Sequence, residues 1–305
     1  MRISRGLTAL SLVFAFEALA GPLHDAARQG DTAAMAALLD DGASIDEVAV
    51  MTPLQMAAMN DQIAAVELLI ERGADLDAAS PIIGTALHAA AQRGYADIIN
   101  KLLAAGADPD VRNKDTFTPI MVASLNGKLK AVVSFIDAGA DQNAIGMGRG
   151  RMHTGGDIEV GSLHLAASNG HWDIYDALIE SGARPAIHEN ISSKLKAADP
   201  ELGGDLAMKF CGNCHIVASQ SQILLKELRP GPPLMGVYGR PIGSLEDYEY
   251  SEAFRKTDGV WDADMLYSFV VSANLTIPGT RMVFNDGWTE EDALHIVAYF
   301  ASFVE

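Results

Sequence analysis

Residues 52–58 read TPLQMAA, and variants of this stretch recur along the N-terminal half of the chain. The copies at residues 85–90 and 118–123 read TALHAA and TPIMVA, each starting 33 residues after the one before. Two flanking copies, PLHDAA at 22–27 and GSLHLAA at 161–167, bring the number to five. A period of this length is typical of stacked repeats, because one short unit cannot bury its apolar face alone. The stretch therefore predicts a helical solenoid.

Each copy continues with two large apolar residues and then a glycine. These groups are Leu38-Leu39 with Gly42, Leu68-Leu69 with Gly73, Leu102-Leu103 with Gly106, Phe135-Ile136 with Gly139, and Leu178-Ile179 with Gly182. The pattern resembles the ankyrin repeat, in which Thr-Pro-Leu-His opens a first helix and Gly-Ala-Asp begins a protruding hairpin. The resemblance covers residues 22 to about 188. It implies a curved surface that binds proteins, and it implies that His88 and His164 pack and hydrogen-bond within their repeats.

The repeat rhythm is interrupted once. Ile120 and Leu163 hold the same place in the fourth and fifth copies but lie 43 residues apart, which leaves about ten extra residues. These fall within residues 143–156, a glycine-rich stretch that also contains Arg149 and Arg151. We expect a lengthened hairpin tip there. Two interpretations stay open, a segment that contacts a partner and a tolerated loop.

Both cysteines of the chain, Cys211 and Cys214, lie in the sequence CGNCH at residues 211–215. Two thiols at this spacing can each add to a haem vinyl group, and the imidazole of His215 is then held against the iron. We therefore expect one covalently bound haem c. The alternative is a redox or zinc CxxC motif. It is less favoured because the chain has no second cysteine pair and because His215 follows directly.

Further segments follow this motif in a fixed order. A helix is expected to start at Asp199-Pro200 and to lead into Cys211, and a closing helix capped by Thr289 is expected over residues 289–304. Between them lie GPPLMGVYGR at 231–240, YSEAF at 250–254, Trp261, and IPGTRMVF at 277–284. In this order the segments resemble a class I cytochrome c of the mitochondrial and alpha-proteobacterial type, over residues 199–304. Fold class is accordingly expected to be all-α, an ankyrin-repeat solenoid followed by a small helical haem domain.

The resemblance also implies site residues. His215 and Met282 would be the axial ligands of the haem iron, and Pro232 would supply the carbonyl that orients His215. The pocket would further include residues near the haem propionates and one near the methionine sulfur, namely Arg240, Tyr250, Trp261 and Phe269.

Other residues compete for the same roles or depart from the family. Met235 and Met265 are the competing thioethers, but a methionine is usually core filler. His295 is interpreted as a half-buried or surface residue of the last helix rather than as a ligand. Phe269 stands where many members of the family have a tyrosine, so a hydrogen bond to the methionine sulfur would be missing. Gly204 and Tyr299 are expected where the first and last helices of this domain cross.

Residues 1–20 combine Arg2 and Arg5 with an apolar run and end in Ala18-Leu19-Ala20. This is the pattern of an export signal with a signal-peptidase site, and an uncleaved anchor is disfavoured because the run is short and interrupted by Glu17. Haem attachment of this type takes place outside the cytoplasmic membrane, so a periplasmic location is expected. The predicted domains are a signal peptide at 1–20, ankyrin repeats at 21–190, a linker at 191–198 and a cytochrome c domain at 199–305.

The formal net charge of the chain is −18. Residues 21–190 carry 11 basic and 23 acidic residues, and residues 191–305 carry 9 basic and 16 acidic ones. Nucleic acid or anionic lipid would need a field of opposite sign, so neither is expected as a partner, and no stable membrane insertion is expected. A redox protein with a basic or neutral surface fits better.

Two axial ligands leave the iron no open position, and such a site exchanges single electrons. The function expected from the sequence is therefore a periplasmic electron carrier, not an enzyme and without catalytic residues, whose ankyrin array docks a protein partner. Two alternatives stay open. In the first, Met282 dissociates readily and the protein is a haem peroxidase or ligand sensor. In the second, the protein is an ankyrin scaffold in which haem has a structural role.

Overall fold

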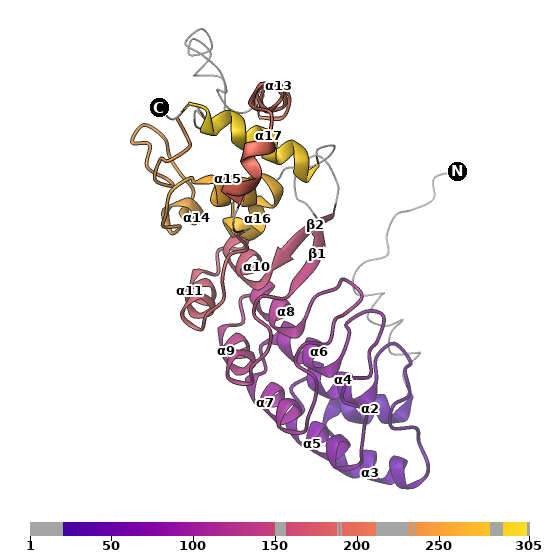
Figure 1. Cartoon of the computed structure of the whole chain (residues 1–305). Coiled ribbons are helices and arrows are strands. Elements are labelled where there is room, and N and C mark those ends of the chain that lie inside the picture. The colour runs from indigo at the N-terminus through magenta and orange to yellow at the C-terminus, as the bar shows by residue number, and fades with distance from the viewer. Residues whose placement is uncertain are drawn as a thin grey trace, which may run out of the picture. The chain divides into compact units, whose positions relative to one another are not determined.

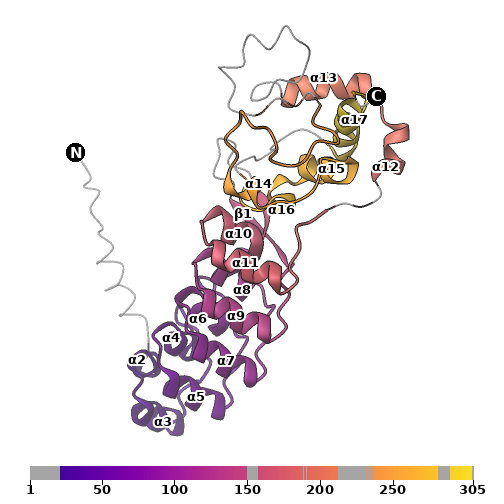
Figure 2. The same cartoon turned by 90° about the vertical axis from the view of Figure 1, so that its left-hand side faces the viewer.

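The computed structural model describes residues 21–149, 157–187, 189, 191–211, 232, 234, 236–280 and 289–303. These residues fall into two compact units, both built from helices (Figures 1 and 2). The first unit takes in the described residues up to Met147 together with His171–Gly182. The second takes in Gly148–Gly170 and the described residues from Ala183 onward, and each unit is treated by itself below.

Short paired helices make up the first unit, as the repeat period predicts. In chain order they are α2 (Pro22–Gln29), α3 (Thr32–Asp40), α4 (Pro53–Met59), α5 (Ile63–Glu71), α6 (Ala86–Arg93), α7 (Ala96–Ala104), α8 (Pro119–Leu125), α9 (Leu129–Asp137) and α11 (Trp172–Glu180). First helices of successive repeats pack on one another, as do second helices (Figure 1). Small side chains allow this close approach, since Ala57, Ala58, Ala89 and Ala90 are fully buried. The predicted helical solenoid is confirmed.

Helix starts in the array follow from local hydrogen bonding. The Oγ1 of Thr52 accepts a bond of 3.2 Å from the amide of Gln55, and Oε1 of Gln55 accepts one of 3.1 Å from the amide of Thr52. This capping box satisfies two amides that the helix itself leaves unpaired, and Pro53 fits the first helical position because it has no amide hydrogen to lose. The Thr-Pro-Leu-Gln stretch thus specifies where α4 begins.

The residue three positions after each cap links its repeat to the following loop. Nε2 of Gln55 donates to the carbonyl oxygens of Ala78 and Gly84 at 2.6 and 2.8 Å. In the third repeat, Nδ1 of His88 bonds to Thr85 and Nε2 lies 2.9 Å from the carbonyl oxygen of Phe117. Burial lowers the pKa of His88 from its ordinary value, and the bond to Phe117 acts against this. His88 therefore has the structural role that the repeat pattern predicts, although it reaches into the next loop.

A row of aspartates, here called the aspartate ladder, connects the hairpins of neighbouring repeats. In each rung a carboxylate of one repeat accepts a bond from an aspartate amide of the next. The rungs are Asp46 with Asp75 at 3.0 Å, Asp77 with Asp108 at 3.1 Å, and Asp110 with Asp141 at 2.9 Å. Burial raises the pKa of Asp77, while the bond from Asp108 lowers it.

Among its described residues, the second unit contains two strands, seven α-helices and one 3-10 helix. They are β1 (Ile145–Arg149, which begins in the first unit), β2 (Asp157–Gly161), α10 (Ser162–Ser168), α12 (Ile191–Lys194), the 3-10 helix η1 (Leu195–Ala197), α13 (Pro200–Phe210), α14 (Glu252–Arg255), α15 (Ala263–Val271), α16 (Ala273–Thr276) and α17 (Glu290–Ala301). The strands β1 and β2 pair with each other. They lie on either side of residues 150–156, which include Arg151 and are outside the described part of the chain, so the expected hairpin tip stays a prediction.

Helices α13 and α17 pack closely at a pair of glycines (Figure 1). A Cβ on Gly203 would overlap the backbone carbonyl of His295, and a Cβ on Gly204 would lie 2.9 Å from the ring of Tyr299. The predicted crossing of Gly204 and Tyr299 is confirmed, but the tighter constraint is at Gly203. His295 is half-buried, as predicted, and its Nδ1 accepts a bond of 2.7 Å from the amide of Asp199.

The predicted starts of these two helices are confirmed, while α17 ends at Ala301, before the predicted residue 304. The carboxylate of Asp199 caps α13 by accepting from the amide of Glu201 at 2.9 Å, and Pro200 occupies the first helical position. Thr289 caps α17, its Oγ1 accepting from the amide of Asp292 at 3.2 Å. The cap at Asp199 fixes where α13 begins, and α13 ends directly before Cys211.

Candidate functional site

Cys211 forms the C-terminal cap of α13, and it is 5% exposed. Its amide donates to the carbonyl oxygen of Ala207 at 2.8 Å, which continues the helical pattern up to the cysteine. The other predicted attachment and iron-binding residues, Cys214, His215 and Met282, lie outside the described residues. Pro232 is described and is half-buried. The structure therefore locates one end of the predicted attachment motif, at the end of the helix that crosses α17.

An aromatic cluster brings together three predicted pocket residues and one that the sequence analysis missed. The ring of Phe254 lies 5.7 Å from Tyr250, 6.2 Å from Trp261 and 5.8 Å from Phe269, measured between centroids. Trp261 and Phe269 are 5.0 Å apart at a steep interplanar angle. Tyr250, Trp261 and Phe269 are all buried. Phe254 was part of the quoted YSEAF stretch, but only its contacts show that it connects the other three rings.

Backbone bonds hold Arg240 beside this cluster. The amide of Gly239 donates to the carbonyl oxygen of Trp261, and the amide of Trp261 donates to that of Arg240, both at 2.9 Å. Pro241 and Val260 form an antiparallel bridge immediately beyond. Two segments about twenty residues apart in sequence are thereby joined, so Arg240 and Trp261 share one site.

Polar groups near the cluster favour an anionic partner. Burial lowers the pKa of the Arg240 guanidinium from its ordinary value, and neighbouring Tyr250 acts in the opposite direction. Burial also raises the pKa of the Tyr248 hydroxyl. The Oγ of Ser251 is buried and has no hydrogen-bond partner within the described part of the chain. A buried hydroxyl of this kind is costly unless a ligand satisfies it.

The donor set matches the chemistry of haem. A haem presents a large apolar ring, which suits the aromatic cluster, and two propionate carboxylates, which suit a guanidinium and a buried hydroxyl. The residues present therefore fit the group that Cys211 and Cys214 are predicted to bind. Ser251 is a further candidate for this site that sequence reasoning missed, because only the burial of its hydroxyl draws attention to it.

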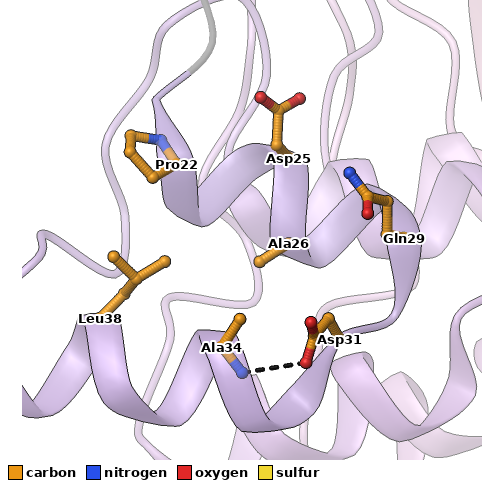
Figure 3. Close-up of a pocket in the computed structure, with 7 residues that line it drawn as sticks. All are labelled: Pro22, Asp25, Ala26, Gln29, Asp31, Ala34 and Leu38. Atoms are coloured by element: carbon orange, nitrogen blue, oxygen red, sulfur yellow. Dashed lines mark hydrogen bonds between the residues drawn. The ribbon is translucent and has the colours of Figure 1, made fainter.

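The first repeat contains a shallow surface pocket of a different kind (Figure 3). Its lining residues come from α2, α3 and the turn between them: Pro22, Asp25, Ala26, Gln29, Asp31, Ala34 and Leu38. Both carboxylates there have structural partners, since Asp31 caps α3 and Asp25 pairs with Arg28 at 3.4 Å. Among the described residues no cluster of His, Cys, Asp and Glu could hold a metal ion.

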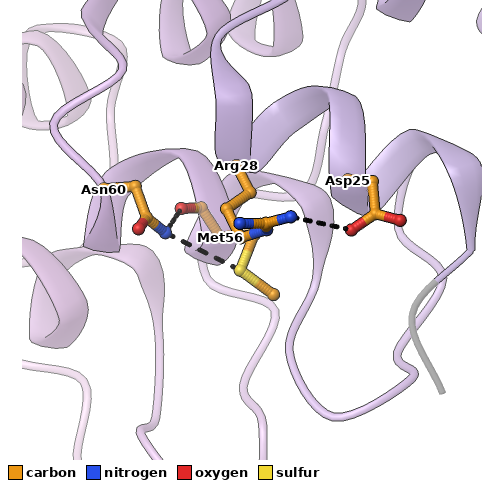
Figure 4. A network of polar contacts seen from close by, with 4 residues as sticks. All are labelled: Asp25, Arg28, Met56 and Asn60. Atoms are coloured by element: carbon orange, nitrogen blue, oxygen red, sulfur yellow. Dashed lines mark hydrogen bonds and ion pairs between the residues drawn. The ribbon is translucent and has the colours of Figure 1, made fainter. Parts of the chain in front are cut away.

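Next to this pocket, the first helices of the array carry a mixed polar surface (Figure 4). Asn60 donates to the carbonyl oxygen of Met56 at 2.8 Å, and its amide nitrogen is also 3.7 Å from the sulfur of Met56. Arg28 and Asp25 form their ion pair on the neighbouring helix. Polarisable methionine sulfur beside charged groups is a surface on which protein partners can pack.

Comparison with known proteins divides the chain in two. A family model of ankyrin repeats matches residues 14–80 and 87–189 in three copies. The C-terminal part is similar to curated cytochromes c. A cytochrome c homolog of Rickettsia conorii is 34% identical over 115 residues, which make up 38% of this chain and 62% of that protein. Cytochrome c of Theileria annulata is 36% identical over 101 residues, 33% of this chain and 83% of that protein.

Cytochrome c of Euglena viridis is also 36% identical over 101 residues, and 93% of its length is covered. The chain spans 62% of the length of the cytochrome c homologs of Rickettsia conorii and Rickettsia felis. No helix among the described residues is long and apolar enough to cross a membrane. Together with the helix pairs of the first unit and the haem-compatible site of the second, these similarities show that the chain belongs to both the ankyrin-repeat and the cytochrome c families.

Proposed function

We propose that the protein is an exported, periplasmic electron carrier with one haem attached through Cys211 and Cys214. His215 and Met282 would bind the iron from opposite sides. The observation that carries the proposal is the aromatic cluster with its half-buried guanidinium, in a domain similar to cytochrome c. Bound haem would supply reversible one-electron exchange at iron.

The residues of this chain would set the conditions for that exchange. Phe254 and Phe269 would exclude water from the bound haem, which would lower the local dielectric constant and strengthen nearby electrostatic interactions. The Arg240 guanidinium and the Ser251 hydroxyl would donate to a propionate. The backbone bonds between Trp261 and the Gly239–Arg240 segment keep these groups in place.

The ankyrin array would dock a protein partner and keep the haem domain near it. Tethering raises the effective concentration of the haem domain at that partner, so a weak contact at the haem edge suffices and turnover stays rapid. The acidic character of the chain, with a net charge of −18, favours a partner with a basic or neutral surface.

The proposal is tested by optical spectra of the full-length protein in both oxidation states, with carbon monoxide added to the ferrous form. A closed site gives a low-spin spectrum that the gas does not change, and Met282→Ala opens the site to it. Met265→Ala is the matched control and should leave the spectrum unchanged. Ready binding of carbon monoxide by the unmutated protein would refute the closed site and favour a ligand sensor or peroxidase.

Export has its own test. The proposal predicts that the protein recovered from a bacterial host is found in the periplasmic fraction, with a mass that corresponds to loss of residues 1–20. A full-length chain in the cytoplasmic fraction would contradict it, whatever the haem spectrum shows.

A further inference from the structure

The segment that leads to Met282 is a tight turn. After α16, the amide of Thr280 donates to the carbonyl oxygen of Ile277 at 3.0 Å, which closes a four-residue turn over Pro278 and Gly279. Gly279 has φ +85°, a conformation that glycine adopts without strain and other residues resist. Ile277 and Thr280 are buried, at 0% and 5% exposure. Met282 follows this turn by two residues.

Helix α10 covers this turn within the second unit. A Cβ on Gly279 would lie 2.6 Å from the Cβ of Ala167, so the two backbones meet where neither residue has more than a methyl group. The amide of Gly279 also points to Nδ1 of His164, at a long distance of 3.5 Å. Both α10 residues are buried, at 8% for His164 and 5% for Ala167. The contact is therefore close and buried from solvent, and it consists mainly of van der Waals packing.

A second connection holds the same segment from the stretch that precedes α12. The amide of Ala186 donates to the carbonyl oxygen of Leu275 at 2.9 Å, and Oγ1 of Thr276 donates to the carbonyl oxygen of Ala186 at 3.1 Å. Helix α16 also packs against β2 and α10. The turn before Met282 is thus held by residues of the last repeat and by the segment that follows it.

His164 differs in its surroundings from the equivalent histidine of the third repeat. There, Nδ1 of His88 bonds to the backbone and hydroxyl of the capping residue Thr85. The fifth repeat has Gly161 at the cap, which has no hydroxyl, and Nδ1 of His164 faces the amide of Gly279. The repeat histidine therefore bonds within the array in the third repeat, whereas in the fifth repeat it contacts Gly279 of the haem domain.

From these contacts we infer that His164 and Ala167 are positioning residues for the sixth ligand of the haem iron. By holding the turn at Ile277–Thr280, α10 would fix the point from which the chain continues to Met282. This rests on the proposed function, in which Met282 is that ligand.

The test measures imidazole binding to the ferric full-length protein, because imidazole competes with a methionine ligand. Ala167→Val adds two methyl groups against Gly279 and should push the turn away from α10. Overpacking of this kind corresponds to roughly a 5- to 100-fold gain in imidazole affinity. The matched control is Ala91→Val at the same position of the third repeat, which should stay within about twofold of the unmutated protein. Thermal unfolding of both variants monitors the stability of the repeats.

His164→Ala provides a milder perturbation if Ala167→Val fails to fold or to take up haem. Removing a long hydrogen bond and its packing should raise imidazole affinity about two- to fivefold. The control here is His88→Ala, which loses comparable bonds within the array and should leave affinity unchanged. The inference is overturned if folded Ala167→Val binds imidazole as the unmutated protein does, or if His164→Ala matches His88→Ala.

Met282→Ala separates failure of this inference from failure of the proposed function. It should raise imidazole affinity more than either α10 variant, since it removes the ligand itself. If Met282→Ala has no effect, the ligand assignment is wrong and the inference fails with it. If Met282→Ala has its effect while the α10 variants have none, only the positioning role is refuted.

Discussion

The crossing of α13 and α17 allows a stability prediction that does not depend on haem chemistry. A Cβ at Gly203 would overlap the carbonyl of His295 and lie 3.1 Å from the amide nitrogen of Ile296, both backbone atoms that cannot rotate away. Carbon and oxygen normally stay about 3.3 Å apart or more, so Gly203→Ala requires the helices to separate by about 1 Å or more. The overlap arises entirely from the backbone of α17.

Overpacking of a well-packed contact costs about 1–3 kcal/mol, with larger values when backbones must move. Alanine has a higher helix propensity than glycine by about 1 kcal/mol, and this gain in α13 offsets part of the overpacking cost. We therefore expect a net destabilisation of about 1–2 kcal/mol, or about 4–16 °C in the unfolding temperature of a domain of this size. The assay is thermal unfolding of the haem-loaded protein, followed in the haem absorption band.

Gly204→Ala is the matched control, one residue along the same helix. Its Cβ would meet only the ring edge of Tyr299 at 2.9 Å, and a side chain can move aside. The two substitutions add the same methyl group and the same helix propensity, so the difference between them isolates the backbone overlap. If Gly203→Ala unfolds at the same temperature as Gly204→Ala, the described approach of the two helices is wrong.

Three further predictions follow from the caps, the site and the aspartate ladder. Thr289→Ala should lower the stability of the haem domain by about 1 kcal/mol, because it removes the capping box of α17, and urea unfolding would measure this. Arg240→Gln should lower the reduction potential, since loss of a half-buried positive charge favours the oxidised state; an unchanged potential in a redox titration would place Arg240 away from the haem. Burial raises the pKa of folded Asp77 above its unfolded value. The stabilisation that protonated Asp77 provides is therefore largest below the unfolded pKa and is lost as the pH rises through the folded pKa. Asp77→Asn keeps the acceptor for the amide of Asp108 but does not ionise, so the free energy of unfolding of the variant minus that of the unmutated protein should be larger at pH 7 than at pH 3, by less than about 1 kcal/mol because the group is partly exposed; an equal difference at both pH values would contradict this.

Local patterns in the sequence predicted the parts of the fold that depend on local interactions. The 33-residue period predicted the helix pairs, and the pairs Asp199-Pro200 and Thr289-Glu290 predicted helix starts, because caps and periodicity involve only residues a few positions apart. The crossing at Gly203 was missed by one residue. Which of two adjacent glycines faces a backbone depends on the rotation of α13 about its axis, and no local pattern specifies that rotation.

The candidate site was predictable only as far as family resemblance extends. Resemblance supplied Arg240, Tyr250, Trp261 and Phe269, and the structure brings the last three together with Phe254 into one cluster. It did not supply Ser251, whose significance comes from burial without a partner. The roles of Cys214, His215, Pro232 and Met282 remain predictions, to be tested by the spectra proposed above.

The contact between α10 and the turn at Ile277–Thr280 joins residues more than 100 positions apart and could not have been anticipated from either repeat or haem motif. It depends on Ala167 and Gly279 both being small. These residues come into contact only in the folded second unit, so neither sequence motif could point to them.

The assignment of α10 to the second unit has a consequence for where the chain can be cut. A haem-domain fragment that begins after the last repeat would lack α10, whose Ala167 lies against Gly279. Such a fragment would expose part of a turn whose end residues, Ile277 and Thr280, are 0% and 5% exposed in the protein. A fragment that keeps α10 retains this cover, and we expect it to be the more stable of the two.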